Sequence, residues 1–253
     1  MIPALHLSFG YPWWLTYGHL PIVAVSGLLA ALGFWRKWRV WMCVWGALFL
    51  WSSTAFLAAR FVVDIDGEAE MPTANFLPSG KGKVLDLGAG TGRSSIMVLK
   101  ARPQATLVAL DLFGQSFDQH FGPGQSPQQR LMANLQAAGV DSRATIVTAD
   151  VRKLPFEPAS FDGAVCAYVL EHLDREGIQQ SLAEAARVTK PGGDYLLMLV
   201  AKEPWLQYTF GPMLMHQGFH GADWWTSRLE ESGFHVVEHG TQPATLYLLS
   251  RRI

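Results

Sequence analysis

A short apolar run that ends in three closely spaced glycines constrains this chain more than any other feature. The run, 84–87, is followed directly by Gly88, Gly90 and Gly92 and then by an amphipathic stretch, 93–101. This pattern predicts a strand, a tight turn and the start of a helix. Glycine lets the turn adopt positive φ and lets a bound molecule approach the backbone, while the first N–H groups of the helix remain free to bind it.

An acidic residue, Asp111, lies 21 residues after Gly90, at the end of a second apolar run. An acid at this position can accept hydrogen bonds from both hydroxyls of a ribose. The nicotinamide fingerprint spaces its glycines G-x-G-x-x-G. Here the spacing is G-x-G-x-G, and Asp86 stands on the strand before it. The spacing disfavours a nicotinamide oxidoreductase, and a glycine turn that binds no ligand stays as an alternative.

Three further apolar runs follow along the chain. The third, 144–149, ends in Asp150; the fourth, 163–168, leads to His172; the fifth is 195–200. Amphipathic stretches separate these runs, and strands that alternate with helices predict a mainly parallel sheet covered on both faces. The stretch 201–220, rich in aromatic residues, predicts no regular element.

In this order and spacing, the motifs resemble those of class I S-adenosylmethionine-dependent methyltransferases, in the small-molecule group that includes ubiquinone/menaquinone-type enzymes. The resemblance covers about residues 66–253. It implies a Rossmann-like, doubly wound α/β sheet of seven strands with a closing antiparallel hairpin. It also implies S-adenosylmethionine as the cofactor and methyl transfer as the reaction.

The resemblance assigns roles to individual residues, of which spacing alone supports only Asp86, the glycines and Asp111. The glycine turn would surround the methionine part of the cofactor, and Asp111 would hold the ribose with its neighbour against the adenine. The ends of the third and fourth strands would line the rest of the site. The cofactor residues implied in this way are Asp86, Gly88, Ala89, Gly90, Asp111, Leu112, Asp150, Val151, Cys166 and Ala167.

The N-terminal quarter of the chain has a different composition from the remainder. Seven of the ten tryptophans lie in the first 51 residues, no charged residue occurs before Arg36, and all 21 acids lie at or after Asp64. Two uncharged, mostly apolar runs, 20–35 and 40–59, are separated by a basic turn, 36–39. A membrane-spanning helix needs about 20 such residues, so the composition predicts a membrane hairpin.

We therefore predict a membrane segment, 1–63, with two transmembrane helices at about 19–35 and 40–61. A linker, 64–82, and a methyltransferase domain, 83–253, follow. A signal peptide is disfavoured because no positively charged region precedes the apolar run. A single span and a soluble helical extension remain alternatives.

Two arguments about membrane orientation conflict. The positive-inside rule places the basic turn 36–39 in the cytoplasm, whereas a cytoplasmic cofactor requires both chain ends on that side. We give more weight to the cofactor supply. The expected location is the inner (cytoplasmic) membrane of a bacterium, with the catalytic domain facing the cytoplasm.

Composition also excludes several classes of partner. The net charge is −1 and no basic patch is visible, which argues against nucleic acid as a partner. Cys43 and Cys166 lie in unrelated segments, so neither a disulfide framework nor a metal site is expected. The fourth strand lacks the Asn/Asp-Pro-Pro-Tyr motif of methyltransferases that act on adenine or glutamine. A small lipophilic acceptor remains: a quinone-type phenol, a lipid amine or acid, or a thiol.

Methyl transfer from a sulfonium needs a general base only when the nucleophile must lose a proton. His172, after the fourth strand, is the first candidate because a neutral imidazole accepts a proton near pH 7. Tyr208 and His216 form a second set in the aromatic stretch 201–220. Each of the three has a purely structural role as its alternative.

The sequence thus predicts a membrane-anchored S-adenosylmethionine-dependent methyltransferase. The alternative is a catalytically degenerate module of the same fold that serves as a membrane-tethered binding or assembly protein. The attacking atom, the acceptor and the oligomeric state stay open.

Overall fold

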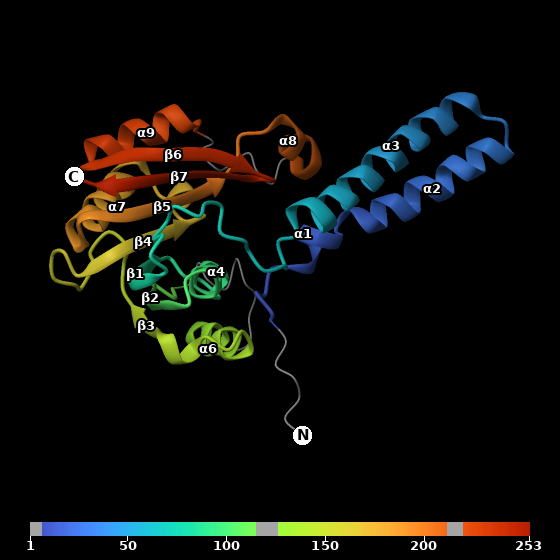
Figure 1. Cartoon of the computed structure of the whole chain (residues 1–253). Coiled ribbons are helices and arrows are strands. Elements are labelled where there is room, and N and C mark those ends of the chain that lie inside the picture. Colours follow the sequence, from blue (N-terminus) through green and yellow to red (C-terminus); the bar gives the residue numbers. More distant parts are fainter. Residues whose placement is uncertain (1–6, 115–125, 212–219) are drawn as a thin grey trace, which may run out of the picture. The chain divides into compact units, whose positions relative to one another are not determined.

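The computed structural model describes residues 7–114, 126–211 and 220–253, which form two compact units (Figure 1). We call them the sheet unit and the helical unit. The sheet unit takes in residues up to 10, then 68–202 and the C-terminal part from 217, and the helical unit takes in 11–67 and 203–216. Each is described by itself.

The sheet unit is built on seven strands in the order β3-β2-β1-β4-β5-β7-β6. The first five pair in parallel, and β7 pairs antiparallel with both β5 and β6. The predicted doubly wound sheet with a closing antiparallel hairpin is therefore confirmed. The strands are β1 (Lys81–Leu87), β2 (Gln104–Asp111), β3 (Ala144–Thr148), β4 (Phe161–Ala167), β5 (Thr189–Val200), β6 (Phe234–Gln242) and β7 (Thr245–Arg252).

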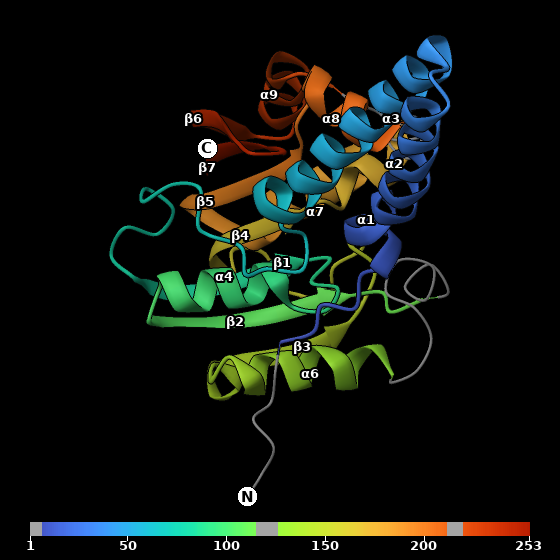
Figure 2. The same cartoon turned by 90° about the vertical axis from the view of Figure 1, so that its right-hand side faces the viewer.

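Helices cover this sheet, as Figure 2 shows. Among the described residues, one helix packs along β2 and another along β3, while two pack on the β5, β6 and β7 side. Side chains fix where two of them begin: Ser126 and Gln129 form a capping box, and Asp174 accepts from the Gly177 N–H at 2.8 Å. The helices are α4 (Arg93–Ala101), α6 (Pro127–Ala137), α7 (Arg175–Val188) and α9 (Ala222–Glu231), with 3₁₀ turns η2 (Asp141–Arg143) and η3 (Leu170–His172).

The burial of β1 explains why the apolar run before the glycines is continuous rather than alternating. Val84, Leu85 and Leu87 are all fully buried, because a central parallel strand is covered on both faces. The edge strand β6 alternates instead between exposed and partly buried positions after the buried Phe234. The core therefore sits around β1 and its neighbours, directly below the glycine turn.

The helical unit is a pair of long helices with short helices beside it. Its elements are α1 (Trp13–Tyr17), α2 (His19–Trp35), α3 (Arg39–Leu57), the π-helical η1 (Ala58–Val63) and α8 (Pro204–Phe210). Helices α2 and α3 pack against each other. The helical stretches 13–35 and 39–63 are each long and apolar enough to cross a membrane.

The structure differs from the sequence prediction in three places. A regular helix, α8, occupies part of 201–220, because Pro204 starts it at a position where proline fits. Residues 7–10 group with the sheet unit, where Phe9 is buried. The predicted linker is anchored to the sheet unit, since the Leu77 N–H donates to Asp194 Oδ2 at 2.8 Å.

Candidate functional site

The glycine turn joins β1 to α4 and is held against the end of β2. The backbone N–H groups of Gly88 and Ala89 both donate to the Leu110 carbonyl, at 2.8 and 2.9 Å. Gly88 has φ of 76°, and a Cβ added there would overlap the Val169 side chain. Glycine is therefore required at this position both by backbone conformation and by lack of space.

Asp86 lies below this turn and is completely buried. Its Oδ2 accepts hydrogen bonds from the hydroxyls of Ser94 and Ser95, at 2.8 and 2.5 Å. Its Oδ1 has no partner among the described residues. Burial raises the pKa of Asp86 to about 6. A buried, unpaired carboxylate oxygen is costly unless a ligand donor completes it. The ammonium group of a bound methionine moiety is a donor of this kind, so the turn fits S-adenosylmethionine.

Asp111 ends β2 beside the same turn. Its Oδ2 accepts from the Gly90 N–H and its Oδ1 from the Phe113 N–H, each at 2.9 Å. These bonds orient the carboxylate, and each oxygen keeps a further lone pair for a ribose hydroxyl. Leu112 is 54% exposed and offers an apolar surface for an adenine ring. The predicted roles of these two residues stay predictions that the geometry accommodates.

The remaining predicted cofactor residues differ in accessibility. The Asp150 carboxylate is bound by Arg152, with Nη2 to Oδ2 at 2.6 Å, and this hydrogen bond lowers its pKa. Val151 is almost fully buried, and Cys166 is fully buried, which raises the pKa of its thiol. Ala167, at the end of β4, is half-buried. In this part of the site, backbone atoms and Ala167 are better placed for a ligand than the Cys166 thiol.

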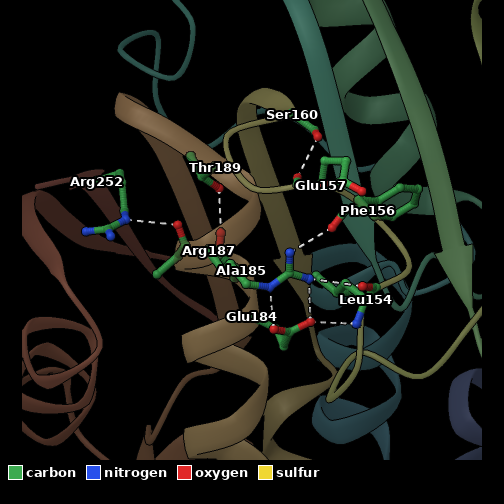
Figure 3. A network of polar contacts seen from close by, with 10 residues as sticks. Leu154, Phe156, Glu157, Ser160, Glu184, Ala185, Arg187, Thr189 and Arg252 are labelled. Carbon is green, nitrogen blue, oxygen red and sulfur yellow. Dashed lines mark hydrogen bonds and ion pairs between the residues drawn. The ribbon is translucent and has the colours of Figure 1, made fainter.

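The loop that carries Asp150, residues 149–160, is fixed to α7 by a partly buried polar network (Figure 3). The Arg187 guanidinium donates to the carbonyls of Leu154 and Phe156, at 3.0 and 2.7 Å, and to Glu184 at 2.6 Å. Glu184 also accepts from the Leu154 N–H at 2.7 Å. The network provides hydrogen-bond partners for backbone groups of the loop that no strand pairs with. Side chains of α7 thus hold the loop that carries the predicted cofactor residues Asp150 and Val151.

The end of β4 carries a carboxylate that the sequence reasoning did not select, Glu171. Its Oε1 accepts from the Val200 N–H at 3.1 Å, and its Oε2 is shielded from solvent without a partner among the described residues. Burial raises the pKa of Glu171 to about 7. The predicted base His172 is the next residue in η3 and is exposed. The sequence could not tell which of these two neighbouring side chains is shielded from solvent.

The other two predicted catalytic residues lie outside the described part of the sheet unit. Tyr208 lies on α8, in the helical unit, and is 62% exposed. His216 lies outside the described residues. Both remain predictions.

Asn134 is a second residue that the sequence reasoning missed. It is buried on α6, and its Nδ2 donates to the Thr91 carbonyl at 2.8 Å and to the Ser8 carbonyl at 3.0 Å. Its Oδ1 accepts from the Ser8 N–H at 3.0 Å. One side chain thus ties the glycine turn to the segment that precedes the helical hairpin. A single asparagine within a helix gave no signal of this in the sequence.

Comparison with known proteins identifies the class of this site. The methyltransferase domain family matches residues 84–193. A ubiquinone/menaquinone biosynthesis C-methyltransferase of Bartonella tribocorum is 34% identical over 137 residues, 53% of this chain and 48% of that protein. A 24-methylenesterol C-methyltransferase of rice is 29% identical over 153 residues, 60% of this chain and 38% of that protein. The chain spans about half the length of the curated relatives that it matches, or less.

Solved structures give the same fold. An O-methyltransferase family protein from Burkholderia thailandensis matches with a TM-score of 0.58 and 18% identity, over 94% of this chain and 69% of that one. A second O-methyltransferase, from Planctomyces limnophilus, matches with a TM-score of 0.57 and 18% identity, over 80% of this chain and 59% of that one. The family match, the sheet order and the glycine turn agree. The chain therefore carries a class I S-adenosylmethionine-dependent methyltransferase domain.

Proposed function

We propose that this protein is a membrane-anchored enzyme that transfers the methyl group of S-adenosylmethionine to a small lipophilic acceptor. One observation carries the proposal. A single chain joins the cofactor turn of the sheet unit to an apolar helical hairpin whose large side chains are exposed. Leu28, Phe34 and Val40, for example, are 73%, 75% and 79% exposed. An apolar surface of this extent on two long helices is typical of contact with lipid.

The names of the relatives support a lipophilic acceptor. One relative acts in ubiquinone and menaquinone biosynthesis and the other methylates a sterol. Quinones with isoprenoid tails and sterols are both membrane lipids, and both relatives are named as C-methyltransferases. We therefore place a quinone-type phenol first among the acceptors, ahead of a lipid amine, a lipid acid or a thiol.

The cofactor and the protein contribute different parts of the methyl-transfer reaction. The cofactor supplies a methyl group that its positively charged sulfur has already activated. The protein then contributes mainly positioning, which is worth up to about 7–11 kcal/mol in favourable cases. Asp86 would hold the amino group of the cofactor and Asp111 its ribose, both from the edge of the sheet where parallel strands end.

A phenol-type acceptor must also lose a proton, and we propose Glu171 as the group that takes it. Its Oε2 is buried and unpaired among the described residues, and its pKa of about 7 leaves it partly ionised at neutral pH. A base with a pKa near the operating pH contributes about 10²–10⁴-fold to the rate. His172, whose side chain is exposed, remains the alternative base.

The hairpin would cross the membrane and keep the sheet unit on the cytoplasmic side, where the cofactor is made. Arg39 and Arg60 are 21 residues apart, about 32 Å along a helix, which matches a hydrocarbon core of about 30 Å. In the turn, the Arg36 guanidinium lies over the rings of Trp35 and Trp38, at 5.2 and 5.9 Å. Such pairs suit a membrane interface, where aromatic and basic side chains gather.

The decisive experiment uses the full chain in liposomes. S-adenosylhomocysteine release is measured with a naphthoquinol that bears an isoprenoid tail and with the same ring without a tail. We expect turnover of the tailed acceptor and its loss in Asp111→Ala. Absence of release from every acceptor class, together with no heat on titration with millimolar S-adenosylmethionine, would contradict the proposal. A reporter fused after Ile253 that is active only outside the cytoplasm would contradict the orientation.

A further inference from the structure

The short helix α8 is bound to the hairpin by its backbone. The Tyr208 carbonyl accepts a hydrogen bond from Trp51 Nε1 at 3.1 Å, and the Thr209 carbonyl pairs with His19 Nε2 at 2.9 Å. The rings of His19 and Trp51 also touch each other, with centroids 5.7 Å apart. One residue from each long helix thus bonds the C-terminal turn of α8, within the helical unit.

These two bonds matter because the Tyr208 and Thr209 carbonyls would otherwise depend on the surrounding medium for a hydrogen-bond donor. The last carbonyls of a helix have no partner inside that helix. At a protein surface water completes them, whereas in lipid a protein donor has to do so. His19 is buried and Trp51 only partly exposed, so the hairpin shields the end of α8 as an apolar environment would demand.

The position of Trp51 along α3 places this contact inside the predicted span. Trp51 stands nine residues before Arg60, about 13 Å along the helix. If the apolar stretch between Arg39 and Arg60 crosses the bilayer, the end of α8 lies below the headgroups of the leaflet nearer Arg60. At that end of the hairpin, Arg60 pairs with Asp64 at 2.8 Å and Thr16 donates to Asp66 at 2.8 Å. These charged groups mark the polar boundary.

The sequence of α8 fits this depth. No charged residue occurs from Pro204 to Met215, and Lys202 and Glu203 stand immediately before the helix. Tyr208 is 62% exposed although it is a large aromatic residue. The charges would lie in the headgroup region and the aromatic face of α8 in the acyl region.

We propose that α8 is a third membrane-embedded helix of the helical unit and lies in the outer acyl region of one leaflet. This inference rests on the proposed membrane anchor.

The test uses nitroxide spin labels on the full chain in liposomes of phosphatidylethanolamine and phosphatidylglycerol. A Cys43→Ser background removes the exposed cysteine and leaves only the buried Cys166. Labels are then placed one at a time by Leu28→Cys in α2, Gln207→Cys in α8 and Gln136→Cys in α6, each at a well-exposed or partly exposed position. Gln136→Cys is the matched control on the sheet unit. Collision with oxygen, which concentrates in lipid, is compared with collision with a water-soluble nickel chelate.

We expect the labels at positions 28 and 207 to collide mainly with oxygen and the label at 136 mainly with the nickel chelate. A water-exposed label at 207 beside a lipid-exposed label at 28 would overturn the inference and leave the membrane anchor standing. Water exposure at all three positions would overturn the anchor itself and the inference with it.

Discussion

The two units of this chain treat apolar side chains in opposite ways. In the sheet unit the apolar residues of β1 are fully buried, whereas in the helical unit large apolar side chains are exposed. Shielded polar atoms without a partner among the described residues occur in both units, but their chemistry differs. In the sheet unit they include a carboxylate oxygen each of Asp86 and Glu171, and in the helical unit they are the uncharged Ser53 Oγ and the ring nitrogen His19 Nδ1.

This contrast indicates that the units are built for different surroundings. A protein in water hides its apolar surface, and buried charges that lack a partner mark a place for a ligand. A helix in lipid exposes apolar surface and satisfies its polar groups internally. We therefore propose that the one chain combines a ligand-binding sheet with a lipid-facing hairpin, and each half of this proposal can be tested separately.

The largest effect is expected from Asp111→Ala in the sheet unit. The change removes a carboxylate that the turn holds toward the ribose, with hydrogen bonds worth about 1.5–3 kcal/mol each. Two such bonds predict a loss of S-adenosylmethionine affinity of about 10²-fold or more, measured by calorimetric titration. Asp223→Ala, an exposed acid on α9, is the control and should leave affinity unchanged. Equal affinity in both variants would remove Asp111 from the cofactor site.

The second prediction concerns the other unpaired carboxylate. If Glu171 is the base, the rate rises with pH through its raised pKa of about 7 and then levels off, because only the ionised carboxylate accepts a proton. Glu171→Gln should lower the rate about 10²–10⁴-fold and abolish this rise of the rate with pH. His172→Gln is the control with the neighbouring side chain. If the rise of the rate with pH persists in Glu171→Gln and is lost in His172→Gln, His172 is the general base.

The same group affects stability with a sign that can be worked out. Its usual pKa is 4.5 and its folded value about 7. Between these values the folded state binds a proton that the unfolded state has released. The free energy of unfolding therefore falls as pH rises through this window. Denaturant titrations at pH 4.5 and pH 7 should show a smaller loss of stability in Glu171→Gln than in the unchanged protein.

The third prediction tests the lipid-facing half of the contrast. Leu28 is 73% exposed on α2, and a lysine at the centre of a membrane helix costs about 2.5–3.5 kcal/mol on insertion. Leu28→Lys should shift the protein out of the membrane fraction after alkaline extraction. Val237→Lys, on the exposed face of β6, changes an exposed apolar residue of the sheet unit and should have no such effect. Equal partitioning of the two variants would argue for a hairpin that lies in water.

The fourth prediction distinguishes two reasons why the glycine turn needs glycine, namely the lack of room for a side chain and the positive φ of the backbone. Gly88 and Gly139 both have positive φ, 76° and 69°, but only at Gly88 does an added Cβ meet another residue, Val169. Gly88→Ala should therefore lower the free energy of unfolding of the sheet unit more than Gly139→Ala does. The expected difference is about 1–3 kcal/mol, which is typical of overpacking. Thermal unfolding of the two variants measures the difference. Similar losses would mean that the turn has room and needs glycine only for its backbone conformation.

The sequence predicted those parts of the molecule that depend on local pattern. The succession of strands along the chain follows from apolar runs and glycine turns, whereas their arrangement in the sheet was expected from the resemblance to the methyltransferase family. The range 19–35 of α2 follows from an uncharged run of the right length. The carboxylates Asp86 and Asp111 could be selected because strand ends and spacing place them beside the turn. These features need only near neighbours in the chain.

Contacts between distant residues could not be predicted in this way. Asn134 bonds to Thr91 and to Ser8, which are 43 and 126 residues away along the chain, and no periodicity in the sequence indicates such bonds. Glu171 and His172 are adjacent, and only the turn of η3 decides which one is buried. The helix α8 was missed because its seven residues carry no hydrophobic period, and contacts with the hairpin complete its C-terminal turn.

The smallest effect is expected from Trp51→Phe, which tests how α8 is held against the hairpin inside the helical unit. The change keeps a six-membered aromatic ring and removes the five-membered ring with the N–H that bonds the Tyr208 carbonyl, a bond worth about 0.5–1.5 kcal/mol. Trp41→Phe is the matched control, since Trp41 Nε1 donates in the same manner to the Leu29 carbonyl, at 3.0 Å, near the other end of the hairpin. A spin label at position 207 should become more mobile in Trp51→Phe and stay unchanged in Trp41→Phe. If both variants leave the label unchanged, α8 is held by the rings and by His19, and the indole bond contributes nothing to its placement.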